Sequence, residues 1–413
     1  MNEKLRHGLG IALGAMAFLC NYSPWVRRAV SLPDALTLTA GEQLVVQTGL
    51  PMRAETDGGA VSVLASQDER VTTLSAEAGG RTSVTFSLLG LIPVHETRVN
   101  VVEERTLIPG GQAVGVALKT RGVLVVSDSA KGRTLRAGDV ILSVNGTETE
   151  NTKALGRQIT GADADTVRLE VLRAGQRLTV EAAAEVDASD GRRKLGVWVR
   201  DSTAGVGTLT YIDPTSGAYG ALGHAIVDAD TGGLLDAREG AILHASIVGV
   251  SRGQSGRAGE LKGNFLKEGR QIGSLLENCE YGIYGVMAET PESPLYPQGV
   301  KVASRSAVHT GAASIIATVD GGGPKEYGVE IVRCFAQSEP SQKGMILRVT
   351  DERLLEKTGG IVQGMSGSPI LQDGKIIGAV THVYLSDSTR GYGMYIEWML
   401  EKSDTLNAEN KAA

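Results

Sequence analysis

The chain has 413 residues and a net charge of −6, from 41 lysines and arginines against 47 aspartates and glutamates. This mixed, mildly acidic charge excludes a general electrostatic attraction to nucleic acid. The 42% hydrophobic content excludes a disordered chain, and the 54 glycines without a three-residue repeat exclude collagen. The length predicts about two or three domains, and Cys20, Cys279 and Cys334 are too few for a disulfide scaffold. A bond between Cys279 and Cys334 is left open.

Residues 1–28 have the pattern of an export signal. Lys4 and Arg6 precede an apolar run at residues 8–20, and Arg27 and Arg28 follow it. A positive end followed by an apolar run of this length is typical of a signal peptide or a membrane anchor. We therefore expect export across the cytoplasmic membrane, and the sequence leaves open whether the segment is removed.

Residues 32–105 consist of short alternating or apolar runs separated by glycine, proline and aspartate. This pattern is typical of strands joined by turns. No catalytic constellation occurs in this stretch, so we expect a small β-rich spacer or interaction domain.

Residues 106–184 follow a more specific order. A glycine turn and a strand are followed by a second strand at residues 140–144, a hairpin turn at Asn145-Gly146 and a helix near residues 151–160. Two strands around Ala174-Gly175 complete the order. With the run Arg136-Ala137-Gly138-Asp139, it resembles a bacterial PDZ domain, the alternative being a generic β-sheet domain.

A PDZ domain binds an extended peptide at a sheet edge and captures its terminal carboxylate with backbone N–H groups. By the resemblance, the peptide-binding loop lies at Gly115, Val116, Ala117 and Leu118.

Residues 195–413 again contain many short strands, with turns such as Asp320-Gly321 and Asp373-Gly374 between them and few helical stretches. Short strands at regular spacing predict a β-barrel or a pair of barrels.

The sharpest chemical motif in this region is Gly364-Met365-Ser366-Gly367-Ser368-Pro369. Flanking glycines let the chain turn so that the Ser366 hydroxyl is exposed. The N–H groups of Gly364 and Ser366 then point to one place and form an oxyanion hole. The motif predicts a serine nucleophile, although the same residues also occur in ordinary turns.

A serine nucleophile needs a general base, and histidine is the usual one. Of the six histidines, His224 is the best candidate, because it follows a strand and stands among small residues. His244 and His309 lie in apolar runs that indicate packing or surface roles. His382 follows Ser366 on a predicted strand, and it either lines the substrate pocket or satisfies a buried partner.

A third group is expected to orient the imidazole. Asp228, Asp230 and Asp236 lie near His224 in the sequence, and Asp351 ends a predicted strand. The residues alone do not choose among these four.

Residues 207–226 and 349–383 resemble the stage IV sporulation protein B family, PDZ-containing serine endopeptidases of the chymotrypsin-like clan. The resemblance implies a mainly β chain, with a chymotrypsin-like double β-barrel domain at residues 195–413. It implies His224 as base, Asp351 as orienting acid and Ser366 as nucleophile. Asp351 lies closer to the serine in sequence than the acid of most chymotrypsin-like enzymes.

The resemblance also implies a function. The protein is expected to cleave itself and then a regulatory membrane protein, which releases an intramembrane protease that matures a sigma factor. It would act in the space between mother cell and forespore. No P-loop, dinucleotide fingerprint or metal cluster is present, so neither a cofactor nor a metal is expected.

Two other functions remain open. One is an exported quality-control protease, although in such enzymes the PDZ domain usually follows the protease domain. The other is a non-enzymatic PDZ scaffold with a degenerate protease domain.

Overall fold

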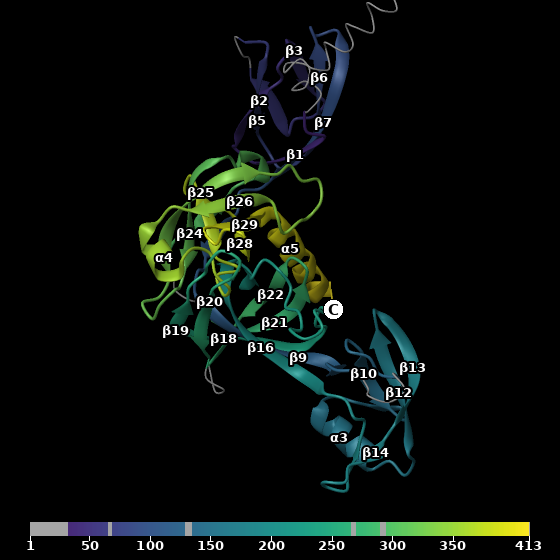
Figure 1. Cartoon of the computed structure of the whole chain (residues 1–413). Helices are drawn as coiled ribbons and strands as arrows, with labels where there is room; N and C mark the ends of the chain where they lie inside the picture. Colours follow the sequence, from purple (N-terminus) through teal and green to yellow (C-terminus); the bar gives the residue numbers. More distant parts are fainter. Residues whose placement is uncertain (1–31, 65–67, 129–133, 266–269, 290–294, 413) are drawn as a thin grey trace, which may run out of the picture. The chain divides into compact units, whose positions relative to one another are not determined.

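The computed structural model describes residues 32–64, 68–128, 134–265, 270–289 and 295–412 (Figure 1). The predicted export signal at residues 1–28 lies outside the described residues. Within them, no helix is long and apolar enough to cross a membrane. The chain divides into two compact units, residues 1–105 with 301–309, and residues 106–300 with 310–413.

The first unit is a pair of small sheets. Strands β1, β7, β6 and β3 form one sheet in that order, and β2, β5 and β4 form the other. Alternate residues of β5 and β6 are buried, as expected for strands with one face on a core. The strands are β1 (Ala35–Thr39), β2 (Gln43–Gln47), β3 (Met52–Thr56), β4 (Val61–Leu64), β5 (Val71–Ala76), β6 (Gly80–Leu88) and β7 (Ile92–Val102).

A late segment of the chain also belongs to this unit. The short helix η1 (Arg305–Ala307) packs on β1, and the Ser304 hydroxyl donates to Glu42 Oε1 at 2.7 Å. The predicted spacer domain therefore includes residues 301–309, which lie far from it in the sequence.

The second unit contains two closed barrels. In the first, each strand pairs antiparallel with the next in the order β9, β16, β17, β22, β21, β18, and β18 returns to β9. Its core includes Val116, Leu118, Leu209 and Tyr219. The strands are β9 (Ala113–Val125), β16 (Val199–Ile212), β17 (Ala218–Ala221), β18 (Ala237–His244), β21 (Gln271–Cys279) and β22 (Gly282–Met287), with β8 (Thr106–Pro109) paired to β16.

The second barrel closes in the same way, in the order β24, β25, β26, β29, β28, β27 and back to β24. Two six-stranded antiparallel barrels confirm the predicted mainly β fold with a double-barrel domain. The strands are β24 (Gly311–Ala317), β25 (Lys325–Cys334), β26 (Met345–Val349), β27 (Pro369–Gln372), β28 (Lys375–Val383) and β29 (Arg390–Tyr395).

Further elements decorate the barrels. Helix α4 (Glu352–Thr358) follows β26, helix α5 (Ile396–Ala412) follows β29, and β19 (Ser246–Ser251) pairs with β20 (Glu260–Asn264) in a hairpin. Strand β23 covers Val300–Val302.

A separate domain, residues 122–200, is inserted between two neighbouring strands of the first barrel. The far end of β9 leaves the barrel and pairs with β10, and β16 enters the barrel after pairing Val199 with Val125 (Figure 1). The elements of the inserted domain are β10 (Val140–Val144), β11 (Thr147–Glu148), α3 (Thr152–Thr160), β12 (Thr166–Arg173), β13 (Gln176–Ala183), β14 (Glu185–Val186) and β15 (Arg193–Lys194).

The local signals in this domain have clear physical causes. Asn145 and Gly146 both take positive φ, 50° and 82°, which the predicted tight hairpin turn requires. Asp139 of the Arg136-Ala137-Gly138-Asp139 run is buried and accepts two hydrogen bonds from the Arg173 guanidinium, at 2.7 and 2.8 Å. This bidentate pair fixes the start of β10 against the end of β12.

The strand pairing does not follow the predicted border at residue 106. Residues 106–120 form β8 and the first part of β9, which belong to the first barrel, and the double-barrel part therefore begins before the inserted domain. The local sequence predicts the strand at the start of β9 correctly, but it does not determine which sheet that strand joins.

Candidate active site and peptide groove

The Gly364-to-Pro369 turn lies between the two barrels. Gly367 has φ +95°, and a Cβ on it would lie 2.1 Å from the Thr208 carbonyl oxygen of β16. The Ser366 carbonyl accepts from Thr208 N–H at 3.0 Å, and Gly367 N–H donates to the Val380 carbonyl at 2.7 Å. The turn is therefore pinned to both barrels, and only glycine fits at position 367.

The N–H groups of Gly364 and Ser366 have no acceptor among the described residues. Gly364 takes φ +92°, and a Cβ on it would lie 3.0 Å from the Leu261 side chain of β20. On the same side, Leu261 N–H donates to the Gln363 carbonyl at 2.9 Å. The β19–β20 hairpin thus supports the turn and leaves these two donors available for a developing negative oxygen.

The Ser366 hydroxyl is half-buried and donates to the Thr381 carbonyl of β28 at 2.8 Å. This contact holds the side chain in one rotamer. A proton transfer to a base requires the hydroxyl to turn away from this carbonyl.

His224 follows β17 on a tight bend, where Leu222 and Gly223 both have φ +69°. Its Nδ1 lies 2.8 Å from the Ala225 carbonyl oxygen. When Nδ1 carries the proton it donates to this carbonyl, and Nε2 keeps a lone pair that can accept a proton. Burial lowers the pKa of His224, and the Ala225 hydrogen bond opposes that shift only in part, so the ring is neutral near pH 7.

A short chain of contacts joins the histidine bend to the serine turn. Leu222 N–H donates to the Thr208 carbonyl at 3.2 Å, and Thr208 N–H in turn donates to the Ser366 carbonyl. On the other side, His382 follows Thr381 directly, and its ring centroid lies 5.3 Å from that of His224. The structure therefore brings Gly364, Ser366, His224 and His382 to one place.

His382 is an uncharged neighbour of His224. Burial, followed by the charges of His224 and Lys343, lowers the pKa of His382 to about 4. Its Nδ1 is buried and has no hydrogen-bond partner in the described part of the chain. It therefore does not satisfy a buried partner, which was one of the two roles considered from the sequence.

Asp351 is the N-cap of helix α4. Its Oδ1 accepts from Arg353 N–H at 3.0 Å, and its Oδ2 accepts from Gly328 N–H at 3.2 Å and from the Arg353 guanidinium at 2.7 Å. The Arg353 hydrogen bond, opposed by burial, lowers the pKa of Asp351 to about 2. These partners do not include His224, so the orienting role of Asp351 stays a prediction.

The other candidate acids also have partners of their own. Asp228 and Asp230 bind the Arg200 guanidinium, at 2.7 and 2.8 Å, and Asp236 lies 3.7 Å from Arg121. The hydrogen-bond partner of His224 Nδ1 is instead the backbone carbonyl of Ala225. No pattern of side chains in the sequence predicts this contact.

Gly282, at the start of β22, lies directly behind the histidine bend. A Cβ on it would lie 2.7 Å from the Ala221 carbonyl oxygen and 3.3 Å from Gly223 N. A side chain at this position would clash with the backbone of the histidine bend, so glycine is required here.

Comparison with known proteins decides the family. Residues 191–400, just over half of the chain, match the SpoIVB peptidase S55 family, and residues 100–183 match the PDZ domain family. The chain belongs to the SpoIVB peptidase S55 family. It is a serine endopeptidase with a PDZ domain, as predicted.

The active-form crystal structure of the Rv3671c protease from M. tuberculosis is similar over 48% of this chain and 72% of that chain, at 15% identity and a TM-score of 0.27. No curated protein matches the chain.

The S55 peptidase has a second candidate site in its inserted PDZ domain. A cavity of about 520 Å³ lies between one face of α3, with Leu155 and Ile159, and the segment at residues 193–199. Leu195 and Val197 of this segment pack on the core of the domain, while Trp198 is 78% exposed. A groove between a helix and a strand suits an extended peptide.

The predicted peptide-binding loop at Gly115, Val116, Ala117 and Leu118 was wrong. In the S55 peptidase these residues lie in β9, whose two edges pair with β16 and β18 of the first barrel. A strand paired on both edges has no free N–H groups for a peptide. The sequence signal that was missed is Leu195-Gly196-Val197, with Gly196 at φ +68°, beside α3 but after it in the chain.

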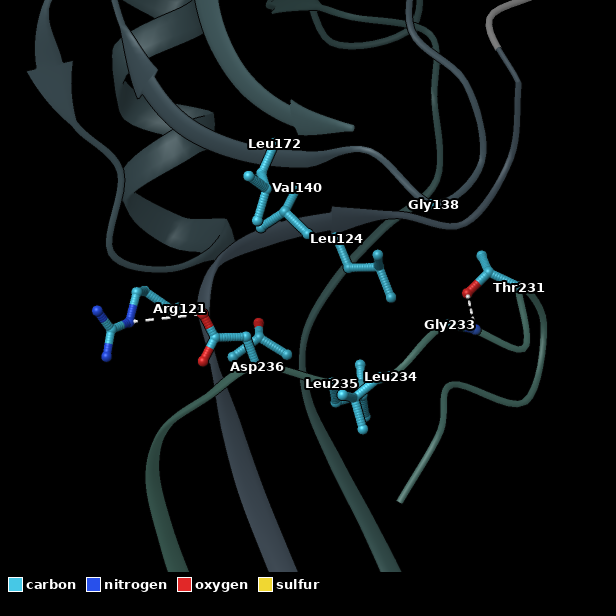
Figure 2. A pocket seen from close by; sticks show the side chains of 11 residues that line it. Arg121, Leu124, Gly138, Val140, Leu172, Thr231, Gly233, Leu234, Leu235 and Asp236 are labelled. Atoms are coloured by element: carbon cyan, nitrogen blue, oxygen red, sulfur yellow. Dashed lines mark hydrogen bonds and ion pairs between the residues drawn. The ribbon is translucent and has the colours of Figure 1, made fainter. Parts of the chain in front are cut away.

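A small pocket of about 50 Å³ lies where the PDZ domain joins the barrel of the S55 peptidase. Figure 2 shows Leu124, Val140 and Leu172 facing Leu234 and Leu235 across it. This pocket is too small for a peptide, and it marks the loop after His224 as a neighbour of the PDZ domain.

The two cysteines that the structure describes are unbonded. Cys279 and Cys334 are both free and half-buried, and burial raises the pKa of each thiol. Neither contributes to the candidate site.

Proposed function

We propose that this S55 endopeptidase uses Ser366 as nucleophile and His224 as general base, with the N–H groups of Gly364 and Ser366 as the oxyanion hole. The observation that carries the assignment is the convergence of the two barrels. The serine turn is hydrogen-bonded to Thr208 of the first barrel. In the second barrel, the Ser366 hydroxyl donates to the Thr381 carbonyl, and the next residue, His382, lies against His224.

The reaction follows from these positions. As Ser366 Oγ bonds to the peptide carbonyl carbon, Nε2 of neutral His224 takes the hydroxyl proton, and the carbonyl electron pair moves onto its oxygen. That oxygen accepts from the two free N–H groups. The imidazolium then gives its proton to the leaving nitrogen as the C–N bond breaks, and water repeats the sequence on the ester.

The Ala225 carbonyl supplies part of what an orienting acid supplies. It selects the tautomer in which Nε2 is the base, because Nδ1 donates to it. A neutral carbonyl stabilises the imidazolium less than a carboxylate does. We propose that Asp351 acts as the orienting acid only if the loop before α4 moves from its present contacts with Arg353 and Gly328.

For the biological role, we propose an exported peptidase of sporulation that cleaves itself and then a regulatory membrane protein, triggering intramembrane proteolysis and sigma factor maturation. The family supports this role, as does the export pattern of residues 1–28. A peptide ligand held between α3 and residues 193–199 is proposed for the PDZ domain, with His382 lining the substrate pocket.

A fluorophosphonate probe tests the site. We expect the protein without residues 1–28 to be labelled at Ser366, and both Ser366→Ala and His224→Ala to lose the label. The labelled residue is mapped by mass spectrometry. No label on the unaltered protein, with folding shown by circular dichroism, would contradict an assembled site and favour a scaffold.

Self-cleavage is tested in the same preparation. The Ser366→Ala protein, which cannot cleave, serves as substrate for the unaltered enzyme. We expect defined fragments, whereas digestion that is confined to unfolded proteins would favour a quality-control protease.

A further inference from the structure

The loop that follows His224 is organised around one buried carboxylate. The Asp228 side chain is fully buried, and its Oδ1 accepts from the N–H of Asp230 at 3.1 Å and from the N–H of Thr231 at 2.9 Å. The Thr231 hydroxyl donates to the same oxygen at 3.1 Å. The loop therefore keeps its shape through Asp228.

The second oxygen of Asp228 accepts from the Arg200 guanidinium at 2.7 Å, and Arg200 also donates to Asp230 at 2.8 Å. Arg200 thus neutralises the buried charge of Asp228 and binds the loop at two residues, Asp228 and Asp230. The Arg200 side chain is 38% exposed while Asp228 is buried, so removal of Arg200 leaves a buried carboxylate without its counter-charge, which is unfavourable. The base of the loop has a different anchor, because the Asn278 side chain binds Ile226 and Leu235.

Arg200 and its neighbour Asp201 lie on β16, directly after the segment that lines the groove. Asp201 Oδ2 accepts from the N–H of Thr152 at 2.7 Å and from its hydroxyl at 2.9 Å. Thr152 is the first residue of α3. Asp201 therefore contacts the groove helix while Arg200 contacts the loop after His224, at a point where the pairing of β16 with β9 shifts register.

We infer that Arg200 is a positioning residue for His224, and that the Arg200–Asp201 pair links the α3 groove to the loop after His224. A peptide that enters between α3 and residues 193–199 changes the spacing that the Asp201–Thr152 contact fixes. The strand passes this change to the Arg200–Asp228 contact, and so to the bend that carries His224. This inference rests on the proposed roles of Ser366 and His224.

The first test measures the rate at which a fluorophosphonate probe labels Ser366. Because a small displacement of a catalytic group is enough for a large loss of rate, we expect Arg200→Gln to label about tenfold to a hundredfold more slowly. Arg200→Lys keeps the charge but reaches one carboxylate, so it recovers part of the rate. Arg177→Gln removes an exposed arginine paired with Glu170 in the same domain and is the matched control.

A thermal unfolding scan of each variant separates positioning from loss of fold. If Arg200→Gln stays folded and labels at the rate of the unaltered protein, the positioning role is overturned. An unaltered protein that does not label at all would instead contradict the proposed function.

The second test does not depend on catalysis. Hydrogen exchange followed by mass spectrometry compares Asp201→Ala with Glu181→Ala, which removes an exposed acid of β13. We expect Asp201→Ala to speed exchange at the start of α3 and also at residues 228–235, and Glu181→Ala to do neither. Faster exchange confined to α3 would overturn the link between groove and loop.

Discussion

At the scale of single residues, the site consists of groups that are neutral and partly buried. Burial lowers the pKa of both His224 and His382, and the two rings lie against each other. A general base must be unprotonated to act, so a lowered pKa extends the active range toward acid. The neighbouring His382 is also neutral near pH 7, because its pKa is about 4.

The pH dependence of Ser366 labelling follows from the lowered pKa of His224. The ordinary value is 6.5, and the folded value is lower, so the neutral base persists below pH 6.5. We expect the labelling rate to fall on acidification with its midpoint below pH 6.5. A rate profile measured from pH 8 to pH 4 checks this, and a midpoint above 6.5 would show that another group controls the rate.

The stability of the fold should also depend on pH through His382. Its pKa is about 4 in the folded chain and 6.5 as its ordinary value, so the unfolded chain binds a proton first as the pH falls. The stabilising contribution is complete above pH 6.5 and is lost as the pH falls toward 4. We expect His382→Phe, which keeps a ring beside His224, to flatten the melting temperature between pH 7 and pH 4. An unchanged slope would count against this origin.

At the scale of elements, helix α4 shows how a predicted catalytic residue can have a structural role. Asp351 caps the first turn, and Gly359 ends the helix at φ +75°. These two signals are the usual start and stop of a short helix. Asp351 is therefore needed for the local fold, whether or not it also serves the reaction.

A pair of substitutions separates the two roles. We expect Asp351→Ala to lower the free energy of unfolding by about 1 kcal/mol, because a helix cap is lost, and Asp351→Asn to keep most of it. Urea unfolding measures both. If Asp351→Asn is stable but labels Ser366 about ten-thousandfold more slowly, the orienting role predicted from the sequence holds.

The sequence predicts turns and strands better than it predicts the long-range contacts that those elements make. The turns at Asn145-Gly146 and Asp373-Gly374 form as expected, because two adjacent residues at positive φ are encoded locally. The serine turn was likewise visible in its glycines. The Ala225 carbonyl was not, since every residue has one, and the Arg200–Asp228 pair depends on a long-range contact.

At the scale of the whole molecule, the same limit explains why the strand pairing departs from the predicted border at residue 106. The first part of β9 was assigned to the PDZ domain because a strand there suits either sheet. The structure pairs it on both edges with barrel strands. The first barrel needs β9, which precedes the inserted domain, and β16, which follows it. A fragment that lacks either strand therefore lacks part of the barrel.

Fragments test this arrangement. We expect residues 195–413, the predicted protease domain, not to fold, because β8 and β9 are missing from the first barrel. Replacing residues 126–198 by Asn-Gly in a chain that starts at residue 106 joins Val125 to Val199, which already face each other. We expect that shortened chain to fold, as shown by near-ultraviolet circular dichroism. A folded 195–413 fragment would contradict the role assigned to β9.

The insertion also sets the order in which a growing chain gains its parts. β9 emerges early, but its partner β16 follows only after the whole PDZ domain, and Ser366 comes near the end of the chain. The PDZ domain can fold while the first barrel is still open. A chain made from its amino end therefore completes the elements of its PDZ domain before Ser366, the proposed nucleophile, is added.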